Sequence, residues 1–392
     1  MTGESPTPKR PQAWSLLTAF RGSAKGGFAR FKVENGGRRR MARMTLGLTA
    51  VAWLPVLILA IVDGVAWGNR VEVPFLRDFL PYGQLVVSIP VLMLGDIAAR
   101  RRLGLATGEL GRSGIVDPAD RGRLDATLQR AADFGRGKTI NAGILAVTLV
   151  ATGVSLFEAG DWLTGGWQVS SEGLTLPGWW YLLVSLPVMR FLALRWLWRG
   201  LVWAWVLLRV AGLDLRPKPM HPDRAGGLAF LGETQVAFGA LVFTFGVQLS
   251  CLAADAHVYR GVDLLTFRGE LVAFVLTSVV TLLLPLLAFG PKLVRAREEQ
   301  LVFLSGFGDR GAAYLGRRFE SGGWEDESGL AEISSLADFG ALYENARLMR
   351  PLPIDRRDLV MLILVAVVPF VPLVFLVVPA REVLKTLAGL LV

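Results

Sequence analysis

The sequence predicts an all-α, polytopic membrane helix bundle of about seven transmembrane helices, and three observations lead to this fold class. First, 53% of the 392 residues are hydrophobic and only 19% are charged, whereas soluble domains have about 45–50% apolar and roughly 25% charged residues. Second, seven uncharged runs approach or reach the roughly 20 residues that a helix needs to cross a bilayer core of about 30 Å. Third, basic residues gather in every second loop, as cytoplasmic loops of membrane proteins do.

The seven runs divide the chain into a membrane bundle and its flanking parts. Six of them lie within residues 45–291 and the seventh lies within residues 358–392. They cover residues 45–62, 79–95, 139–157, 173–189, 234–254, 271–291 and 359–380. The seventh contains Pro369 and Pro372, so it either spans the membrane or re-enters it and returns the C-terminus to the cytoplasm. The last residues, 381–392, are predicted to form a short amphipathic tail at a membrane surface.

The loop charges predict the orientation. Residues 1–44 contain ten basic and two acidic residues, a balance of +8 within the formal net charge of +9. The loop of residues 100–138 has nine basic residues, whereas residues 158–178 have none. Because Lys and Arg stay on the cytoplasmic side, the N-terminus is predicted to be cytoplasmic. The N-terminal tail is predicted to be disordered and to bind anionic lipids of the bilayer, and the near neutrality of the remaining chain argues against nucleic acid as a partner.

Tryptophans flank the predicted outer loop between the third and fourth runs. Indole rings prefer the headgroup level of a bilayer, so we expect these side chains to lie in the membrane interface. They are Trp162, Trp167, Trp179 and Trp180.

Two predicted cytoplasmic segments have helical patterns of their own. In the loop of residues 100–138, Asp117 precedes a helix whose apolar residues recur at helical spacing. These residues are Leu124, Leu128, Ala131 and Ala132. In the loop of residues 292–357, the sixth span continues as a helix, an acidic Gly-rich break follows, and a second helix covers residues 330–349. Such loops suit a cytoplasmic protein partner or contacts within a homo-oligomer.

The fourth run is unusual because arginines continue along the same helix. Arg190 lies about 11 residues from its outer end, where a charge costs at least about 2.5–3.5 kcal/mol unless it is paired or hydrated. Arg195 and Arg199 follow on the same broad face. One interpretation places these arginines in a polar path. The other has them reach toward the headgroups and stack on tryptophans of the same helix.

Asp96 follows the second run at a depth close to that of Arg195 in the fourth, about 17 against about 16 residues from the outer end. We therefore expect Asp96 to pair with Arg195 or Arg199 inside the bundle and to line a polar cavity. The alternative is that Asp96 lies at the cytoplasmic boundary beside Arg100–Arg102. Further polar groups near this path are Gln84, Ser88, Glu233, Gln235 and Gln248.

A compact motif precedes the fifth run and contains His221, Asp223, Gly226 and Gly227. One interpretation is a pair of side chains, His221 and Asp223, that handles protons or binds an anion or lipid headgroup at the cytoplasmic mouth. The alternative is a rigid turn in which Asp223 caps the following helix. The paired glycines permit positive φ or close backbone approach. Two such residues make a weak metal site, so none is assigned.

The sparse reactive residues argue against several functions. With Cys251 as the only cysteine and only two histidines, the chain has no internal disulfide, no thiolate zinc site and no cofactor site that the sequence identifies. It contains no phosphate-binding loop or catalytic motif. We therefore expect a protein that is not an enzyme.

The Trp- and Arg-rich stretch from Arg195 to Arg199 and the motif His221-Pro-Asp-Arg-Ala-Gly-Gly-Leu228 together resemble a family of bacterial multi-spanning membrane proteins whose activity is uncharacterised. The resemblance covers roughly residues 45–390 and implies a location in the bacterial inner membrane. Two functions remain open. One is a transporter or channel for a small solute or ion through a polar path. The other is a non-enzymatic sensor or scaffold that presents its cytoplasmic helices to a partner.

Overall fold

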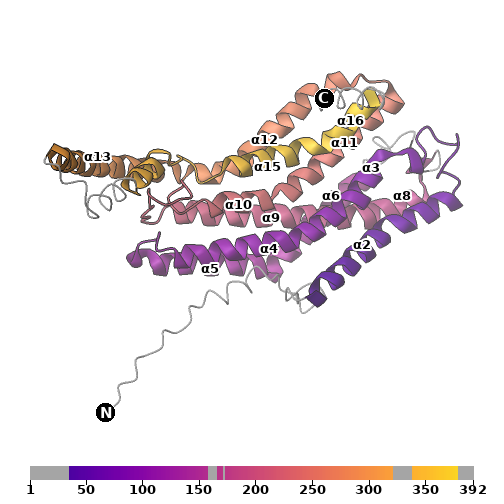
Figure 1. Ribbon diagram of the computed structural model, residues 1–392. Coiled ribbons are helices and arrows are strands. Elements are labelled where there is room, and N and C mark those ends of the chain that lie inside the picture. The colour runs from indigo at the N-terminus through magenta and orange to yellow at the C-terminus, as the bar shows by residue number, and fades with distance from the viewer. Residues whose placement is uncertain (1–34, 158–165, 171–172, 321–337, 378–392) are drawn as a thin grey trace, which may run out of the picture.

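In a computed structural model, the chain is an all-α bundle whose helices lie side by side along one long axis (Figure 1). The structure describes residues 35–157, 166–170, 173–320 and 338–377. The predictions for the N-terminal tail up to residue 34, for Trp162, for the acidic Gly-rich break and for residues 381–392 lie outside the described residues.

Seven helical segments of the described chain are long and apolar enough to cross a membrane, which confirms the predicted fold class. They are α2 (Asn35–Val62); α3 (Phe79–Pro81), η2 (Tyr82–Ser88) and α4 (Ile89–Arg112) in series; α6 (Lys138–Phe157); α8 (Leu176–Trp180), η4 (Tyr181–Ser185) and α9 (Leu186–Ala211) in series; α10 (Phe230–Ala237) and α11 (Gly239–Arg260) in series; η5 (Leu264–Phe267) and α12 (Arg268–Leu287) in series; and α15 (Arg356–Val367), η6 (Val368–Phe370) and α16 (Val371–Val377) in series. Each corresponds to one of the seven apolar runs.

The second and fourth spanning segments are longer than the runs that predict them. They comprise 34 and 36 residues, or about 51 and 54 Å at 1.5 Å per residue, against a bilayer core of about 30 Å. Their helices continue because the charged residues after the runs do not break helical geometry. Both segments therefore extend beyond the apolar part of the bundle.

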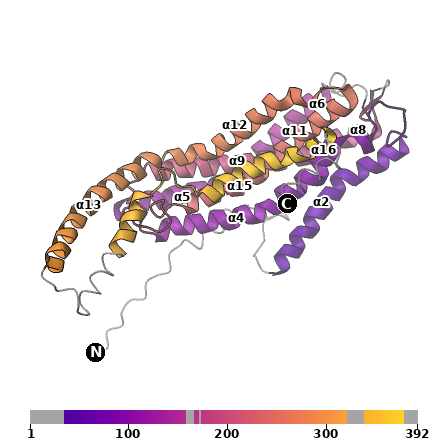
Figure 2. The ribbon, with the colours of Figure 1, turned by 45° about the horizontal axis from the view of Figure 1, so that its top comes forward.

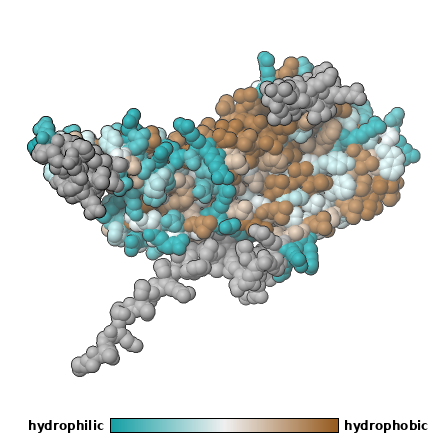
Figure 3. Space-filling view, viewed as in Figure 1, coloured by the Kyte–Doolittle hydropathy of each residue, from teal (hydrophilic) through white to brown (hydrophobic). Residues whose placement is uncertain are grey.

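The loops gather at two ends, which we name after the sides that the charges predict. Among the described residues, the inner end is formed by residues 113–137, 212–229, 288–320 and 338–355, and the outer end by residues 63–78, 166–170, 173–175 and 261–263. Apolar side chains dominate the surface between these ends, and hydrophilic ones gather at the ends themselves (Figure 3). This distribution is that of a membrane-spanning bundle.

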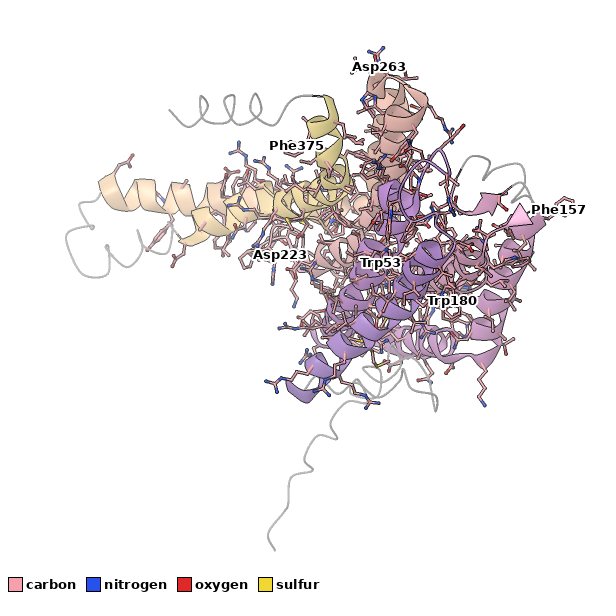
Figure 4. The ribbon with its side chains drawn as sticks, turned by 90° about the vertical axis from the view of Figure 1, so that its right-hand side faces the viewer. Trp53, Phe157, Trp180, Asp223, Asp263 and Phe375 are labelled. Atoms are coloured by element: carbon pink, nitrogen blue, oxygen red, sulfur yellow. The ribbon has the colours of Figure 1, made fainter. Side chains whose placement is uncertain are left out.

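The last spanning segment runs from one end of the bundle to the other. At the inner end, Ile354 lies against Gly232 at the start of α10. At the outer end, Leu373 of α16 packs with Ala253 and Ala254 of α11. Figure 4 looks from the outer end and shows Phe375 of α16 there, near the turn that carries Asp263. The described part of this segment therefore spans the bundle and does not turn back, despite its two prolines.

Helix α5 (Arg121–Arg136) confirms the helical pattern predicted for the first inner loop. Asp117 begins the turn η3 (Pro118–Asp120), which leads directly into α5, and its carboxylate accepts a hydrogen bond from the N–H of Ala119 at 2.9 Å. Its apolar face packs on the inner part of α9. The four residues of that face, Leu124, Leu128, Ala131 and Ala132, are all buried.

Helix α13 (Gly290–Glu320) continues from α12 and projects beyond the rest of the bundle (Figures 1 and 2). A second helix at residues 338–347 returns beside it, and the rings of Phe307 and Phe339 lie 5.2 Å apart between the two. The predicted helical character of this inner loop is confirmed for both described parts.

The outer end is closed by an aromatic cluster, and here one prediction is wrong. Trp167 does not lie at a headgroup surface, because its side chain is fully buried. It precedes the short hairpin of β1 (Val169–Ser170) and β2 (Gly173–Leu174) and contacts Phe75 at 4.9 Å and Tyr181 at 5.4 Å between ring centroids. Trp179 is exposed, as predicted. Trp180 lies on the same side of the bundle as Trp53 (Figure 4).

Candidate functional site

A row of polar groups winds along the second spanning segment. Gln84, Ser88, Asp96 and Arg100 fall in a series with an interval of four, which the backbone carbonyl of Leu92 completes. Residues four apart lie above one another on a helix. Gln84, Ser88 and Asp96 are buried inside the bundle. We call this series the polar stripe.

The outer half of the stripe is a network of neutral groups. Gln84 Nε2 donates to Gln248 Oε1 of α11 at 3.4 Å, and the hydroxyl of Tyr181 donates to Gln84 Oε1. Ser88 Oγ donates to the carbonyl of Gly83 at 2.7 Å. The stripe thus has partners on the second, fourth and fifth spanning segments at one level.

Both π-helical segments of the described chain meet at this network. The segments η2 and η4 carry Gln84 and Tyr181 respectively. Such single-turn π segments in otherwise α-helical runs are frequent at functional sites. A Cβ on Gly83 would lie only 2.6 Å from Cys251 Sγ, so the glycine lets η2 approach α11 closely.

At the outer mouth, two aspartates hold the loop to the bundle. Asp78 Oδ2 accepts from Trp167 Nε1 at 2.8 Å and from Gln168 Nε2 at 3.3 Å. Asp255 Oδ1 of α11 accepts from the N–H of Phe79 at 3.1 Å. Burial raises the pKa of Asp78 above its usual value, and its hydrogen bonds offset this only in part. The sequence reasoning missed these residues.

At the inner half of the stripe, Asp96 is held between two arginines. Arg100 Nε donates to Asp96 Oδ2 at 2.6 Å, and Arg199 of α9 pairs with Asp96 Oδ1. The guanidinium of Arg199 lies over the ring of Trp196 at 5.2 Å. The predicted contact of Asp96 with Arg199 is therefore present in the structure. Asp96 is buried, and it also contacts Arg100, the first arginine of the basic group named in the alternative.

Arg195 does not pair with Asp96. Its Nη1 donates instead to Asn141 Oδ1 of α6 at 2.8 Å. The depth count compares positions along two helices but does not give the direction in which a side chain points, and Arg195 points toward α6. The arginine one turn further along α9 is the one that meets Asp96.

Arg190 lies on the other side of the same helix from the stripe. Its Nη1 donates to the carbonyl of Ala151 at 2.8 Å and its Nη2 donates to Ser155 Oγ at 2.7 Å, both on α6. Within the described residues it has no carboxylate partner. The structure thus separates Arg190 from Asp96 and Arg199, so the path that the sequence suggested through all of them is not continuous at Arg190.

The turn before α10 is a hydrogen-bonded turn built on Asp223, as in the alternative interpretation of the His221 motif, but the N-cap of α10 is Ala229 and not Asp223. Asp223 Oδ1 accepts from the N–H groups of Ala225 and Gly227 at 2.9 and 3.0 Å, and Oδ2 accepts from that of Ala229 at 3.1 Å. Burial acts to raise the pKa of Asp223, but these hydrogen bonds and that with His221 hold it below its usual value. The imidazole of His221 lies 2.9 Å from Asp223 and is partly exposed.

Both glycines of this turn have positive φ, as predicted, with values of 66° at Gly226 and 85° at Gly227. Arg350, which the sequence reasoning missed, locks the turn from the other inner loop. Its Nη2 donates to the carbonyl of Asp223 at 2.6 Å and its backbone N–H donates to that of Arg224 at 2.8 Å.

Glu233 does not join the stripe, because its side chain is exposed. Its backbone carbonyl accepts from Arg102 Nη1 at 2.8 Å, and Arg102 does not belong to the stripe. In the described part of the chain, no group of three or more His, Cys, Asp or Glu side chains is placed to hold a metal ion.

A scan against protein-family models and searches of curated proteins and of solved structures found no match. The functional argument therefore rests on the geometry of the stripe.

Proposed function

We propose that this protein is a transporter or channel that moves a small solute or ion along the polar stripe. The observation that carries the proposal is the burial of Gln84, Ser88 and Asp96 within one apolar spanning segment. Polar and ionisable residues inside membrane helices are costly, and they commonly mark ion and substrate pathways.

The length of the stripe and the number of its partners also fit a path better than one isolated structural contact. It extends from the Gln84 network to Arg100, about 24 Å along a helix at 1.5 Å per residue. Its partners come from different spanning segments, with Tyr181 and Arg199 on the fourth and Gln248 on the fifth. Movement between these segments would break and remake polar contacts along the stripe, which is how alternating access changes exposure of a buried site.

The proposed setting is the inner membrane of a bacterium, with the inner end in the cytoplasm, and the proposed role is non-enzymatic. The loop charges and the family resemblance support this setting.

The test is the flux of probes from proteoliposomes that hold the purified full chain. We expect at least one of rubidium, chloride, sulfate and glycerol to leave faster than from empty liposomes. Gln84→Leu removes a polar group of the stripe and is expected to reduce that flux about tenfold or more. The matched control is Gln129→Leu on α5, whose exposed side chain lies outside the spans; its flux is expected to equal that of the wild type. Flux equal to that of empty liposomes for every probe would overturn the proposal.

One observation favours a second candidate, a membrane scaffold. Helix α13 projects from the bundle with its returning partner at residues 338–347 (Figure 2). Its apolar side chains Val302 and Phe303 are 74% and 63% exposed, as on a surface that binds another protein. A chain without flux that still binds a cytoplasmic protein through α13 would fit this role.

A further inference from the structure

The arginines at the inner half of the bundle outnumber their acidic partner. The inner cluster comprises Asp96, Arg100, Arg195 and Arg199. Two of its guanidinium groups pair with the one carboxylate, the third bonds to Asn141, and the balance of formal charge is +2. Arg195 lies within electrostatic range of the other three charges. The side chains of Asp96 and Arg199 are each only 12% exposed. This pair is therefore largely removed from bulk water.

Its hydrogen-bond donors also exceed its acceptors. A guanidinium has five N–H donors, yet among the described residues Arg195 has Asn141 as its one hydrogen-bond acceptor, and Arg199 has Asp96 as its one acidic partner. The donors of the cluster come from the second and fourth spanning segments.

Excess positive charge in a low-dielectric site is costly unless a counter-charge compensates it. A water molecule supplies an acceptor but no charge. An anion supplies both, and the planar fork of arginine matches the oxygens of carboxylate, sulfate and phosphate groups.

We propose that the inner cluster binds a small oxyanion, with Arg195 and Arg199 as its principal ligands and Asp96 as its competitor for Arg199. The bound group has the chemistry of sulfate or phosphate. The Asp96 carboxylate and the bound anion compete for the guanidinium of Arg199. This competition lets the cluster bind the anion and release it again. The assignment of this anion as the cargo rests on the proposed transport function; the binding site itself does not.

The test is equilibrium binding of radiolabelled sulfate to the purified full chain in phospholipid-free dodecyl maltoside micelles at constant ionic strength. The wild type is expected to bind sulfate saturably. Arg195→Gln and Arg199→Gln are each expected to weaken binding about tenfold or more, since each loses a charge-assisted hydrogen bond. The matched control is Arg209→Gln, the same change on an exposed arginine of the same helix, and it is expected to bind as the wild type does.

Asp96→Asn separates this site from a purely structural cluster. It removes the competing carboxylate, so sulfate affinity is expected to rise about threefold to tenfold. Added sulfate is also expected to raise the melting temperature of the Asp96→Asn variant more than that of the wild type. Folding is checked by circular dichroism and gel filtration. If Arg199→Gln does not fold, Arg199→Lys keeps the charge without the fork and is expected to bind sulfate with intermediate affinity.

No saturable binding by the wild type would overturn the inference, as would weaker binding by folded Asp96→Asn or an equal loss in Arg209→Gln.

Nanodiscs of phosphatidylglycerol, compared with nanodiscs of phosphatidylcholine, identify the source of the oxyanion. Unchanged sulfate affinity supports a dissolved ion, whereas competition by phosphatidylglycerol assigns the site to a lipid headgroup and overturns the dissolved ion as its ligand. Sulfate binding without any flux would contradict the transport proposal and leave the site standing. Rubidium flux without sulfate binding would support the transport proposal and contradict the oxyanion site.

Discussion

Replacing Arg199 by methionine is expected to lower the free energy of unfolding by about 3–5 kcal/mol, because it leaves the buried Asp96 carboxylate with Arg100 alone. The substitution also removes the cation–π contact of Arg199 with the Trp196 ring. The measurement is reversible unfolding of the purified chain in mixed micelles. Arg209→Met, at an exposed position in the last turn of α9, is the control and is expected to cost less than about 1 kcal/mol.

A double variant tests whether the loss comes from the pair. Asp96→Leu combined with Arg199→Met is expected to be less destabilised than the sum of the two single variants, because neither charge is then left buried without its partner. Arg100 can still turn toward water, since its side chain is 21% exposed. Additive losses would contradict the pairing of Asp96 with Arg199. Asp96 and Arg195 have no direct contact, so the losses of unfolding free energy from substitutions at these two residues are expected to be closer to additive.

Gly226→Ala is expected to destabilise the inner end by about 2–4 kcal/mol. The residue has a φ of 66°, and an added Cβ would lie 2.8 Å from Pro217 Cβ and 2.9 Å from Met349 Cε. The strain of a positive φ and the overpacking therefore act together. Thermal unfolding followed by circular dichroism measures the effect.

Gly261→Ala is a closely matched control for this change. Gly261 also has a φ of 66°, but nothing lies within 4 Å of the position of its Cβ. It is expected to cost only the backbone strain, about 1–2 kcal/mol. Equal losses in the two variants would show that Gly226 serves backbone conformation alone and does not permit close packing between the inner loops.

Local sequence patterns predicted the parts of the molecule that local physics determines. The seven spans follow from apolar runs, and the buried face of α5 follows from the spacing of Leu124 and Leu128. The turn at Asp223 follows from the compact Pro- and Gly-rich motif around it. In each case the residues that decide the structure are close together in the chain.

The residues that sequence reasoning missed meet over long separations. Asp78 and Trp167 are 89 residues apart, and Arg350 and Asp223 are 127 apart. No periodicity links such pairs, so Trp167 resembled an interfacial tryptophan although it is buried against an aspartate. The polar spacing of four from Gln84 to Arg100 was visible in the sequence, and it is the signal that would have identified the stripe as a unit.

The existence of the path is tested most directly by the reaction of introduced cysteines with a small, charged methanethiosulfonate in the membrane. In a Cys251→Ser background, Gln84→Cys and Ser88→Cys place thiols on the stripe, and Leu85→Cys and Ile89→Cys place them at buried apolar positions next to it. We expect the two stripe positions to react at least about tenfold faster than their neighbours, because a thiol must be ionised and reached by water to react. Equal rates at all four positions, or no reaction at the stripe positions, would contradict a water-accessible polar path through the bundle.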